Sequence, residues 1–449
     1  MTEICDIQTF LSREKFDLCK PPGTMRQIFA LAWLMDKDHS PETSALALTE
    51  TRDLRSGDVA WTPLAAFARE PDPLPDKADI VVIGAGIMGA TLGERLSAAG
   101  HDVLFLDRHP PATSSTAAST AQVMWGMDMP LTTLAARIGE EAAAQRWRDV
   151  YAAVQGFSDY IDALGINCGK ADIPTLYLNG NKLDAAGLAA EAASQQRHGL
   201  PVRFEAAEAV AARFGITPRP GTVSDGGFEV DPVRLALGLV DTARARGAKL
   251  CFPHDVTALA ADADGVTLTL AQGTIRARHV VLASGYERPL FYLPPAFSLL
   301  STFVIATPPD FAEAHEQVMI WEAADPYLYV RTTGDGRIVA GGEDSDQQRA
   351  RVRDSQIAEK SGTILAKLAA LLERDDLVVD KSWAATFGTS PDTLPALGPA
   401  KGGAGRVWLS YGFGGNGIAF AALAADLLPR ALAGEPVPEL ARYDPYRFS

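Results

Sequence analysis

Three glycines between an apolar run and a helical stretch carry the first chemical signal in this sequence. They follow DIVVI at positions 84, 86 and 89. In a strand–turn–helix context the first allows a tight turn, the second lets the main chain approach a pyrophosphate, and the third lets the helix pack on the strand. Phosphates would then meet the free N–H groups of the helix start. We therefore predict a dinucleotide site rather than a ligand-free glycine turn, formed by Gly84, Ala85, Gly86, Ile87, Met88 and Gly89.

An acidic residue ends the next apolar run, HDVLFLD. This residue, Asp107, follows the glycines at the spacing where an acid accepts hydrogen bonds from ribose hydroxyls. Arg108 comes directly after it and is included in the predicted cofactor site.

A second glycine-rich turn, GFGGNGI, opens the last helical stretch. Its helix N-terminus suits the negative charge that a reduced flavin carries. A further strand, HVVLASG, ends in small residues that allow close passage of a cofactor. Two such helix starts, one for a pyrophosphate and one for a ring, favour FAD over NAD.

The elements that would position these residues are predicted by periodicity. Strand-like runs before and after a helix at 87–99 form a β-α-β unit. STFVIAT, VMIWE, YLYVRTT and RIVAGGE predict an antiparallel sheet far along the chain. The other helical stretches are 131–164, 183–198, 231–246 and 353–374.

Composition sets the class of protein. The chain has 449 residues, 47% of them hydrophobic, which predicts two or three globular domains. A net charge of -15 argues against a nucleic-acid partner. The four cysteines form no CxxC pair and no His cluster accompanies them, so we expect no metal site and a reducing, cytoplasmic location. The run IFALAWLM is too short to span a membrane.

Residues 1–75 lack the strand–helix rhythm and end in the Pro-rich REPDPLPDK. We expect them to pack on the rest of the chain, because Trp33, Trp61 and Phe67 are costly to leave in water. A partner-binding arm and a disordered tail are the alternatives.

With these motifs in order, the chain resembles the D-amino-acid-oxidase-type FAD-dependent oxidoreductases, which include glycine oxidase, sarcosine oxidase and γ-glutamylputrescine oxidase. The resemblance covers about residues 79–435. It rests, in order, on VVIGAGIMGATLGERLSAAG, STAASTAQV, GGFEVDPVRL, VVLASGY, YLYVRTTGDGRIVAGGE, TSPDTLPALGP and GFGGNGI.

The resemblance implies an α/β (α+β) fold, with a discontinuous Rossmann-like FAD-binding domain and an antiparallel-sheet substrate domain. The implied division is an N-terminal extension (1–75), the FAD-binding domain (76–170, 222–292 and 380–449) and the substrate domain (171–221 and 293–379).

The resemblance also implies cofactor contacts beyond the glycine loop. The STAASTAQV turn would meet the pyrophosphate and the flavin edge, HDVTAL would meet the adenine, and the last two glycine-rich segments would pass the cofactor and face its pyrimidine end. The residues concerned are Ser115, Thr116, Ser119, Thr120, Ala121, Val256, Ala283, Gly285, Gly414, Gly415, Asn416, Gly417 and Ile418.

The sequence departs from these relatives in ways that bear on substrate and acceptor. Where many relatives carry an Arg-Pro pair that grips a carboxylate, this chain has Phe387 and Gly388. No Lys or Arg lies between Arg288 and Arg331, so the lysine that aids oxygen in sarcosine oxidases has no counterpart there. Because Cys and His are missing from the places of covalent attachment, we expect non-covalent FAD.

Flavin amine oxidation needs positioning and desolvation more than reactive side chains. The candidates for such a pocket, besides Trp321 and Tyr327, are Tyr329, Trp383 and Phe387, with plain core packing as the alternative. Arg331 is a candidate anion contact, with a surface ion pair to Glu322 or Glu343 as its alternative. No His has a context that would suit a hydrolase, and Asp128 and Glu94 show no acid/base spacing.

The leading hypothesis is oxidation of the C–N bond of a small amine or amino acid by hydride transfer to flavin N5, giving an imine that hydrolyses. The alternatives are a flavin dehydrogenase with an acceptor other than oxygen and a flavin-binding subunit that acts with a partner. An NAD-linked dehydrogenase ranks last. The sequence does not set the oligomeric state.

Overall fold

The computed structural model describes residues 48–61, 68–312 and 317–449. The expectations for Trp33, Phe67 and residues 1–47 lie outside the described residues. Within them, no helix is long and apolar enough to cross a lipid bilayer. The same residues contain no group of three or more His, Cys, Asp or Glu side chains placed to hold a metal ion.

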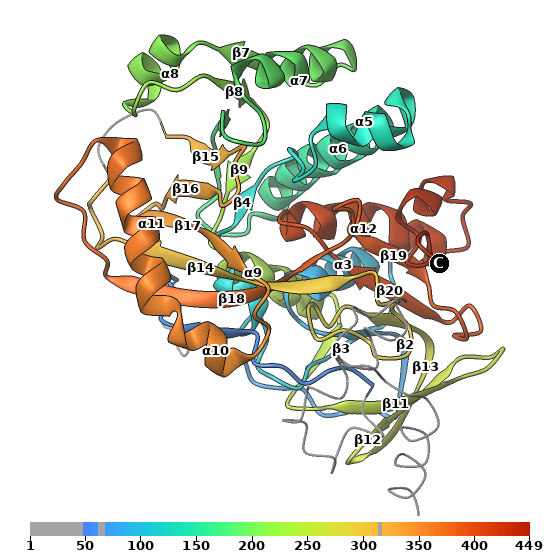
Figure 1. Ribbon diagram of the computed structural model, residues 1–449. Helices are drawn as coiled ribbons and strands as arrows, with labels where there is room; N and C mark the ends of the chain where they lie inside the picture. Colours follow the sequence, from blue (N-terminus) through green and yellow to red (C-terminus); the bar gives the residue numbers. More distant parts are fainter. Residues whose placement is uncertain (1–47, 62–67, 313–316) are drawn as a thin grey trace, which may run out of the picture. The chain divides into compact units, whose positions relative to one another are not determined.

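The first sheet has eight strands and carries the glycine loop (Figure 1). Its core is parallel, because each strand is buried and is followed by a helix or a long crossover. The parallel strands, in spatial order, are β10 (Lys249–Cys251), β3 (Val103–Leu106), β2 (Lys77–Ile83), β13 (Gly273–Leu282) and β20 (Val407–Tyr411). Antiparallel strands β11 (Val256–Ala261), β12 (Val266–Leu270) and β19 (Ala396–Pro399) extend it.

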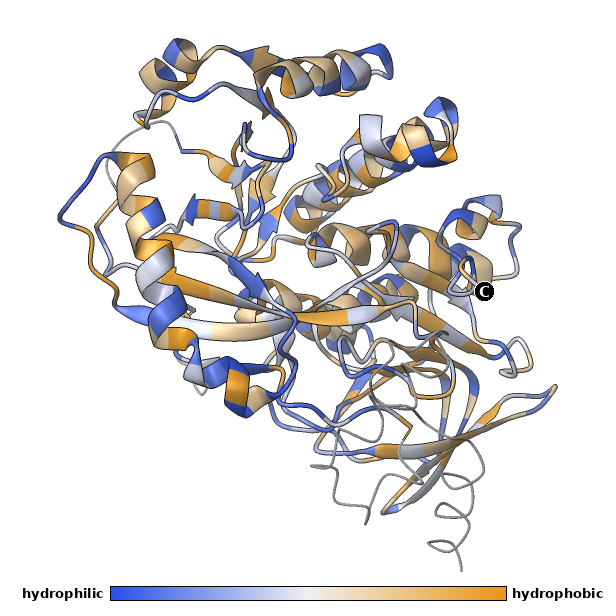
Figure 2. Ribbon diagram, in the orientation of Figure 1, coloured by the Kyte–Doolittle hydropathy of each residue, from blue (hydrophilic) through white to orange (hydrophobic). Residues whose placement is uncertain are grey.

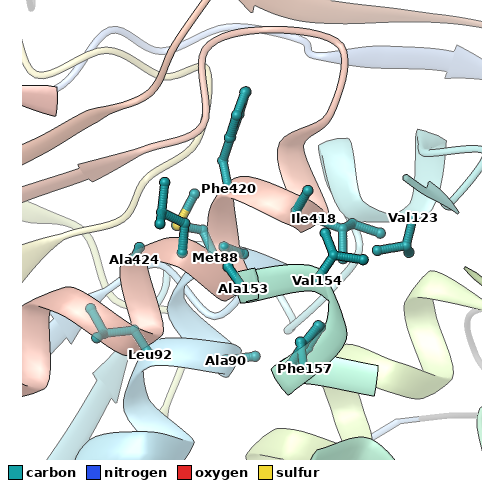
Figure 3. Close-up of a cluster of buried hydrophobic side chains, with 14 of the residues drawn as sticks. Met88, Ala90, Leu92, Val123, Ala153, Val154, Phe157, Ile418, Phe420 and Ala424 are labelled. Carbon is teal, nitrogen blue, oxygen red and sulfur yellow. The ribbon is translucent and has the colours of Figure 1, made fainter. Parts of the chain in front are cut away.

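Helices cover this sheet and pack against one another through small and aliphatic residues. α9 begins as predicted, because Asp231 accepts hydrogen bonds from the N–H groups of Val233 and Arg234. Met88, Phe157 and Ile418 meet where three of the helices converge (Figure 3). The helices are α3 (Ile87–Ala98), α5 (Leu131–Ile138), α6 (Glu140–Leu164), α9 (Pro232–Ala245) and α12 (Gly417–Leu432). The strands of the first sheet and α12 are mostly hydrophobic (Figure 2).

The second sheet has nine strands and is antiparallel except for the parallel pair β15–β6. In spatial order the strands are β1 (Arg55–Gly57), β18 (Lys381–Thr389), β14 (Ser298–Ala306), β17 (Ile338–Ser345), β16 (Leu328–Thr332), β15 (Met319–Glu322), β6 (Thr175–Leu178), β8 (Gly221–Ser224) and β7 (Val202–Glu205). The four strands predicted from STFVIAT to RIVAGGE are therefore confirmed as β14 to β17.

Alternation along these strands gives the second sheet two different faces. Leu328 and Val330 point to a core that α11 (Ile357–Leu372) closes, whereas Tyr329 between them points to the opposite side. That opposite side faces the first sheet across a cavity. The remaining elements are α4 (Ser115–Ala118), α7 (Ala185–Arg197), α8 (Ala207–Phe214), α10 (Ala350–Ser355), a 3-10 helix η3 (Pro438–Tyr443), and a small sheet of β4 (Gln122–Val123), β9 (Phe228–Glu229) and β5 (Ala171–Asp172).

Two segments that the resemblance implied for the FAD-binding domain contribute to the second sheet. β18, at the start of 380–449, pairs along its whole length with β14. β8, which spans the implied boundary at residue 222, pairs with β6. The division into domains stays a prediction. Residues 48–61 contact both sheets. β1 forms the edge of the second sheet, and Trp61 is buried in the core beside the first sheet.

Candidate functional site

A cavity of about 490 Å³ lies between the glycine loop and the inner face of the second sheet. Its size is in the range of small-molecule and cofactor sites. Of the residues predicted to hold the cofactor, its wall includes every one except Ala85, Gly89 and Gly414. The predicted set therefore converges on one place, although it comes from six separate stretches of the sequence.

The glycine loop has the geometry that its spacing predicts. Gly84 has a φ of +108°, which L side chains rarely adopt, and a Cβ there would overlap the carbonyl oxygen of Ala283. A Cβ on Gly89 would overlap the carbonyl oxygen of Gly84, so only glycine lets α3 start this close to the loop. Gly89 therefore shapes the glycine loop, which we call the cofactor cradle, without lining the cavity itself.

The start of α3 is open to an anion. Gly86 is its N-cap residue, no side chain caps it, and its first turn holds no acidic residue. The Ile87 N–H donates to Thr116 Oγ1 at 2.9 Å, which ties the helix start to α4. The buried Ser115 hydroxyl, also in the cavity wall, has no hydrogen-bond partner. Such an unsatisfied donor is expected where a phosphate is to bind.

Asp107 is held in place by the main chain. Its carboxylate accepts hydrogen bonds from the N–H groups of Ala85 at 2.7 Å and His109 at 2.9 Å. Burial nevertheless raises the pKa of this carboxyl group. Hydroxyl donors from a ribose would offset the cost of burying its charge.

Arg108 is fully engaged at the same end of the cavity. It donates to Thr49 Oγ1 at 2.6 Å and to Asp255 at 2.9 Å, and it lies 3.3 Å from Glu287. Burial raises the pKa of Glu287 to about 7, against the opposing effect of Arg108. This arginine therefore organises the ribose end and is not free to reach the far end.

The turn at 118–121 is fixed by donors that lie behind it. Trp383 Nε1 donates to the carbonyl oxygen of residue 118 at 3.0 Å, and Trp61 Nε1 donates to that of residue 119 at 3.0 Å. Arg331 donates to the carbonyls of residues 120 and 121 at 2.8 and 3.0 Å. None of these three side chains lines the cavity, so the four carbonyl oxygens are directed away from it.

These contacts correct two predicted catalytic residues. Trp383 is completely buried and does not reach the cavity. Arg331 also donates to the carbonyl of Val230 and pairs with buried Glu229 at 3.1 Å, so it is neither an anion contact nor a surface ion pair with Glu322 or Glu343. Both side chains bind carbonyl oxygens of the turn at 118–121.

Tyr329 and Phe387 do line the cavity, together with side chains from the neighbouring strands. Cross-strand register aligns Tyr177, Trp321 and Tyr329, and the rings of Tyr177 and Trp321 stack with centroids 4.0 Å apart. The Tyr327 hydroxyl donates to Asp344 Oδ2 at 2.7 Å. We call this surface the aromatic face; it consists of Tyr177, Trp321, Tyr327, Tyr329, Asp344 and Phe387.

Asp128 joins the cavity from the opposite side, although its spacing in the sequence indicated no acid/base role. Its Oδ2 accepts a hydrogen bond from the Gly415 N–H at 2.7 Å, at the start of α12. It lines the cavity with an exposed side chain, and desolvation by the surrounding protein raises its pKa. Asp344 is also affected: burial raises its pKa to about 6, and the charge on Asp128 adds to the effect.

The sequence held unequal signals for the missed residues. Tyr177 and Asp344 occur at strand positions whose alternation points inward, so periodicity was a usable signal. Asp128 lies in a loop far in sequence from Gly415, and no local pattern marks it.

The residues present fit FAD. The glycine cradle, the uncapped helix start, the unpartnered Ser115 hydroxyl and the positioned Asp107 match a pyrophosphate and a ribose. The aromatic face provides a second compartment in the same continuous cavity, as a long cofactor with a ring system requires.

Comparisons with known proteins agree with this geometry. A family model described as "FAD dependent oxidoreductase" (DAO) matches residues 79–430. Human mitochondrial dimethylglycine dehydrogenase is 25% identical over 259 residues, which are 51% of this chain and 29% of that protein. This chain thus spans less than a third of that relative.

Two further relatives match over most of their length. The probable oxidoreductase OrdL of Haemophilus influenzae is 21% identical over 404 residues, 85% of this chain and 87% of that protein. The crystal structure of glycine oxidase from Geobacillus kaustophilus superposes with a TM-score of 0.69 at 19% identity, covering 83% of this chain and 99% of that chain. The expected fold is confirmed, and the cofactor of the matching family is FAD, as expected, rather than NAD.

Proposed function

This chain belongs to the FAD-dependent oxidoreductase family, and from that premise we propose that it oxidises the C–N bond of a small amine or amino acid. The observation that supports this proposal is the aromatic face, which lies across one cavity from the cofactor cradle. When bound, FAD accepts the two electrons and the hydrogen of the substrate C–H bond as a hydride at N5. The relatives named for dimethylglycine and glycine act on compounds with such a bond.

The chain's own residues would position the substrate and keep water away. Tyr177 and Trp321 form a stacked wall, and Tyr329 and Phe387 extend it along the sheet. As the C–H bond breaks with its electron pair leaving, the nitrogen lone pair forms the C=N bond. Water then hydrolyses the released imine to a carbonyl compound and an amine or ammonia.

The substrate nitrogen must lose a proton before its lone pair is available. Asp344 is a better proton acceptor than an ordinary aspartate, since burial raises its pKa to about 6. Tyr327 fixes the orientation of this carboxylate through its hydroxyl. We assign the two residues to holding the proton at Asp344 during the reaction.

An acceptor other than oxygen is the second candidate for the reoxidation step. Within the described residues, Lys182 is the one lysine in the cavity wall, and it pairs with Asp325 at 3.2 Å with 59% of its side chain exposed. A cation that assists oxygen would have to lie inside the cavity. We also propose non-covalent FAD, because the described part of the cavity wall holds no Cys, and His109 and His254 lie beside Asp107 and Asp255 rather than at the aromatic face.

The domain assignment uses the two sheets. We propose that the first sheet with its helices forms the FAD-binding domain, and that the second sheet with α7, α8, α10 and α11 forms the substrate domain. β18 and β8 are placed in the substrate domain.

The test is the visible spectrum of the purified protein, recorded before and after anaerobic addition of amines and amino acids. Loss of the flavin absorbance with one compound class is expected, and admission of air or of an artificial dye then identifies the acceptor. A protein that cannot be loaded with FAD, or a flavin that no compound reduces, would contradict the proposal.

A further inference from the structure

The charges around the aromatic face bear on what kind of amine it accepts. Two carboxyl groups lie near its rings. Asp344 is part of the aromatic face on the second sheet, and Asp128 lies on the opposite wall of the cavity. Tyr327 and Thr302 donate to the first and the Gly415 N–H donates to the second, so neutral donors fix the orientation of both carboxylates. They are close enough for the charge on Asp128 to raise the pKa of Asp344. Among the described residues of the wall, Lys182 is the cation whose charge acts on Asp128, where it lowers the pKa against the larger effect of burial; its side chain is 59% exposed and pairs with Asp325.

A substrate carboxylate would find no buried cationic side chain in the described wall that is not already bound to other groups. Arg108 and Lys182 are the arginine and lysine in the described wall. Arg108 is bound at the ribose end by Asp255 and Thr49, and Lys182 points to solvent beside Asp325. Arg331 is turned to the carbonyls of the turn at 118–121.

Gly388, next to Phe387, cannot be the site of a cationic side chain that replaces the missing arginine. Gly388 lies against Phe413, and a Cβ there would overlap that ring. The missing clamp is therefore not restored by a neighbouring strand residue, because the space is already filled by packing. A buried carboxylate without a cation or donors is costly, which disfavours such substrates.

The aromatic rings favour the opposite charge. The stacked Tyr177 and Trp321 rings and the nearby Tyr329 ring present electron-rich faces, which attract ammonium groups. Carboxylates and ring faces together form a site for a cation. This is the reverse of the site that glycine or dimethylglycine, each with a carboxylate, would need.

We propose that the substrate is an amine whose second, non-reacting end is positively charged and carries no carboxylate, as in an alkyl diamine, and that Asp128, Asp344 and the aromatic rings select it. This inference rests on the proposed function and narrows it. One carboxylate would receive the proton of the reacting nitrogen, while the other pairs with the distal ammonium group.

The experiment uses the FAD-loaded full chain under anaerobic conditions at pH 8. The probes are 1,4-diaminobutane, 4-aminobutanoate and butylamine, which share a carbon chain and differ in the charge of the far end. The three-carbon and five-carbon analogues control for length. The Kd comes from the concentration dependence of the flavin spectral change or of the reduction rate.

The expected result is a diamine Kd at least about tenfold lower than that of the matching amino acid, with butylamine between them. An amino acid that binds as tightly as the diamine, or a series in which nothing binds, would overturn the inference. Reduction of the flavin by amino acids alone would leave the proposed function intact and overturn only the charge preference. Tight diamine binding without any reduction would support the charge preference and contradict the oxidation.

Two variants and a matched control locate the effect. Asp344→Asn and Asp128→Asn should each weaken diamine binding by about tenfold and leave butylamine within about twofold. Asp346→Asn changes an exposed carboxylate two residues along, outside the cavity wall, and should change neither. If both cavity variants lose FAD, the Kd values of the diamine, the amino acid and butylamine for the unsubstituted protein still test whether the site prefers a second positive charge. A diamine Kd unaffected in FAD-loaded Asp344→Asn and Asp128→Asn would overturn the assignment.

Discussion

A buried guanidinium depends on its acceptors, and Arg331 illustrates the cost of losing one side of such a pair. It is 2% exposed, and burial lowers its pKa while burial raises that of its partner Glu229. Arg331→Met would leave Glu229 buried without its cation and free the carbonyls of residues 120 and 121. We expect a loss of about 3–5 kcal/mol in the free energy of unfolding, measured by urea denaturation.

The double variant separates the ion pair from the carbonyl contacts. Arg331→Met with Glu229→Gln should recover part of the stability, because no unpaired charge remains. Its FAD affinity should stay reduced, because the turn at 118–121 still lacks its donor. Full recovery of FAD affinity in the double variant would show that the carbonyl contacts do not matter for the cofactor.

The raised pKa of Asp344 predicts a pH-dependent stability. The folded protein binds this proton more tightly than the unfolded chain, with a pKa of about 6 against 3.8. The free energy of unfolding therefore falls as the pH rises through this window, and the loss persists above pH 6. Asp344→Asn removes the buried charge and should stabilise the protein by about 1–2 kcal/mol at pH 8 but not at pH 4.

Thermal unfolding at the two pH values measures this difference. Asp346→Asn, at an exposed position, should show none of it. Equal melting temperatures of wild type and Asp344→Asn at pH 8 would mean that the carboxylate is not strained by burial. A stabilised variant with weakened ligand binding would show that this site trades stability for function.

For single residues, the sequence indicated which side chains lie near the site but did not indicate which partners they bind. The sequence predicted a strand at YLYVRTT and named Tyr329 and Arg331 as site candidates, and both lie on β16. It did not indicate that the longer side chain would bend to Thr120, Ala121 and Val230, because those partners are distant in sequence. Asp128 was missed for the same reason.

Among the elements, the turn at 118–121 is the part of the cradle with the most external support. Trp383→Phe would leave the carbonyl of Ala118 buried without a donor, at a cost of about 1–3 kcal/mol. We expect weaker FAD binding, measured by cofactor release on dilution, although the side chain does not reach the cavity.

Trp408→Phe is the matched control for that variant. Trp408 Nε1 has no hydrogen-bond partner, so the same substitution removes no hydrogen bond. Equal FAD release from the Trp383 and Trp408 variants would contradict a role for the turn's hydrogen bonds.

The start of α3 gives a second prediction at this scale. In Gly89→Ala, the added Cβ would push α3 away from the carbonyl oxygen of Gly84 and open the pyrophosphate cradle. We expect loss of bound FAD together with lower stability. Gly156→Ala, in the exposed middle of α6 with open space around it, should instead stabilise by about 1 kcal/mol. If Gly89→Ala binds FAD with wild-type affinity, the close contact between the start of α3 and Gly84 is not required for cofactor binding.

Local sequence patterns predicted well those elements whose structure depends on residues that are close in sequence. The strand–turn–helix at 77–98 and the Asp231–Pro232 start of α9 depend on neighbours in sequence, and both are found. The pairing of β18 with β14 was not indicated by the sequence, because an apolar strand does not reveal its partner. Pairing across the two sheets is a tertiary property.

For the whole molecule, residues 48–61 connect the two sheets. Leu48, Thr49 and Leu54 line the cavity, β1 extends the second sheet, and Trp61 supports the cofactor turn. A chain that starts at Thr62 should therefore lose FAD and be less stable than a chain that starts at Leu48, which keeps all of these contacts. Cofactor content and melting temperature of the two truncated forms give the measurement; equal values would contradict this role.

The sequence assigned these residues to an extension because it lacks a strand–helix rhythm there. Their contacts are nevertheless with residues 118–121, 288 and 381–389, far along the chain. The family resemblance began at residue 79, so it contained no information about them. Composition alone, through Trp61, indicated that part of this segment is buried.

The pairing of β1 with β18 has a consequence for how the protein is made. A ribosome releases residues 55–57 long before their partner strand, residues 381–389. The turn that opens α12 emerges later still. Nascent chains of most lengths therefore lack a complete cofactor cavity, and the growing domains must remain apart or protected until then. We infer that FAD enters this protein only after β18 and the start of α12 have been synthesised, so cofactor supply acts on chains that already contain both sheets.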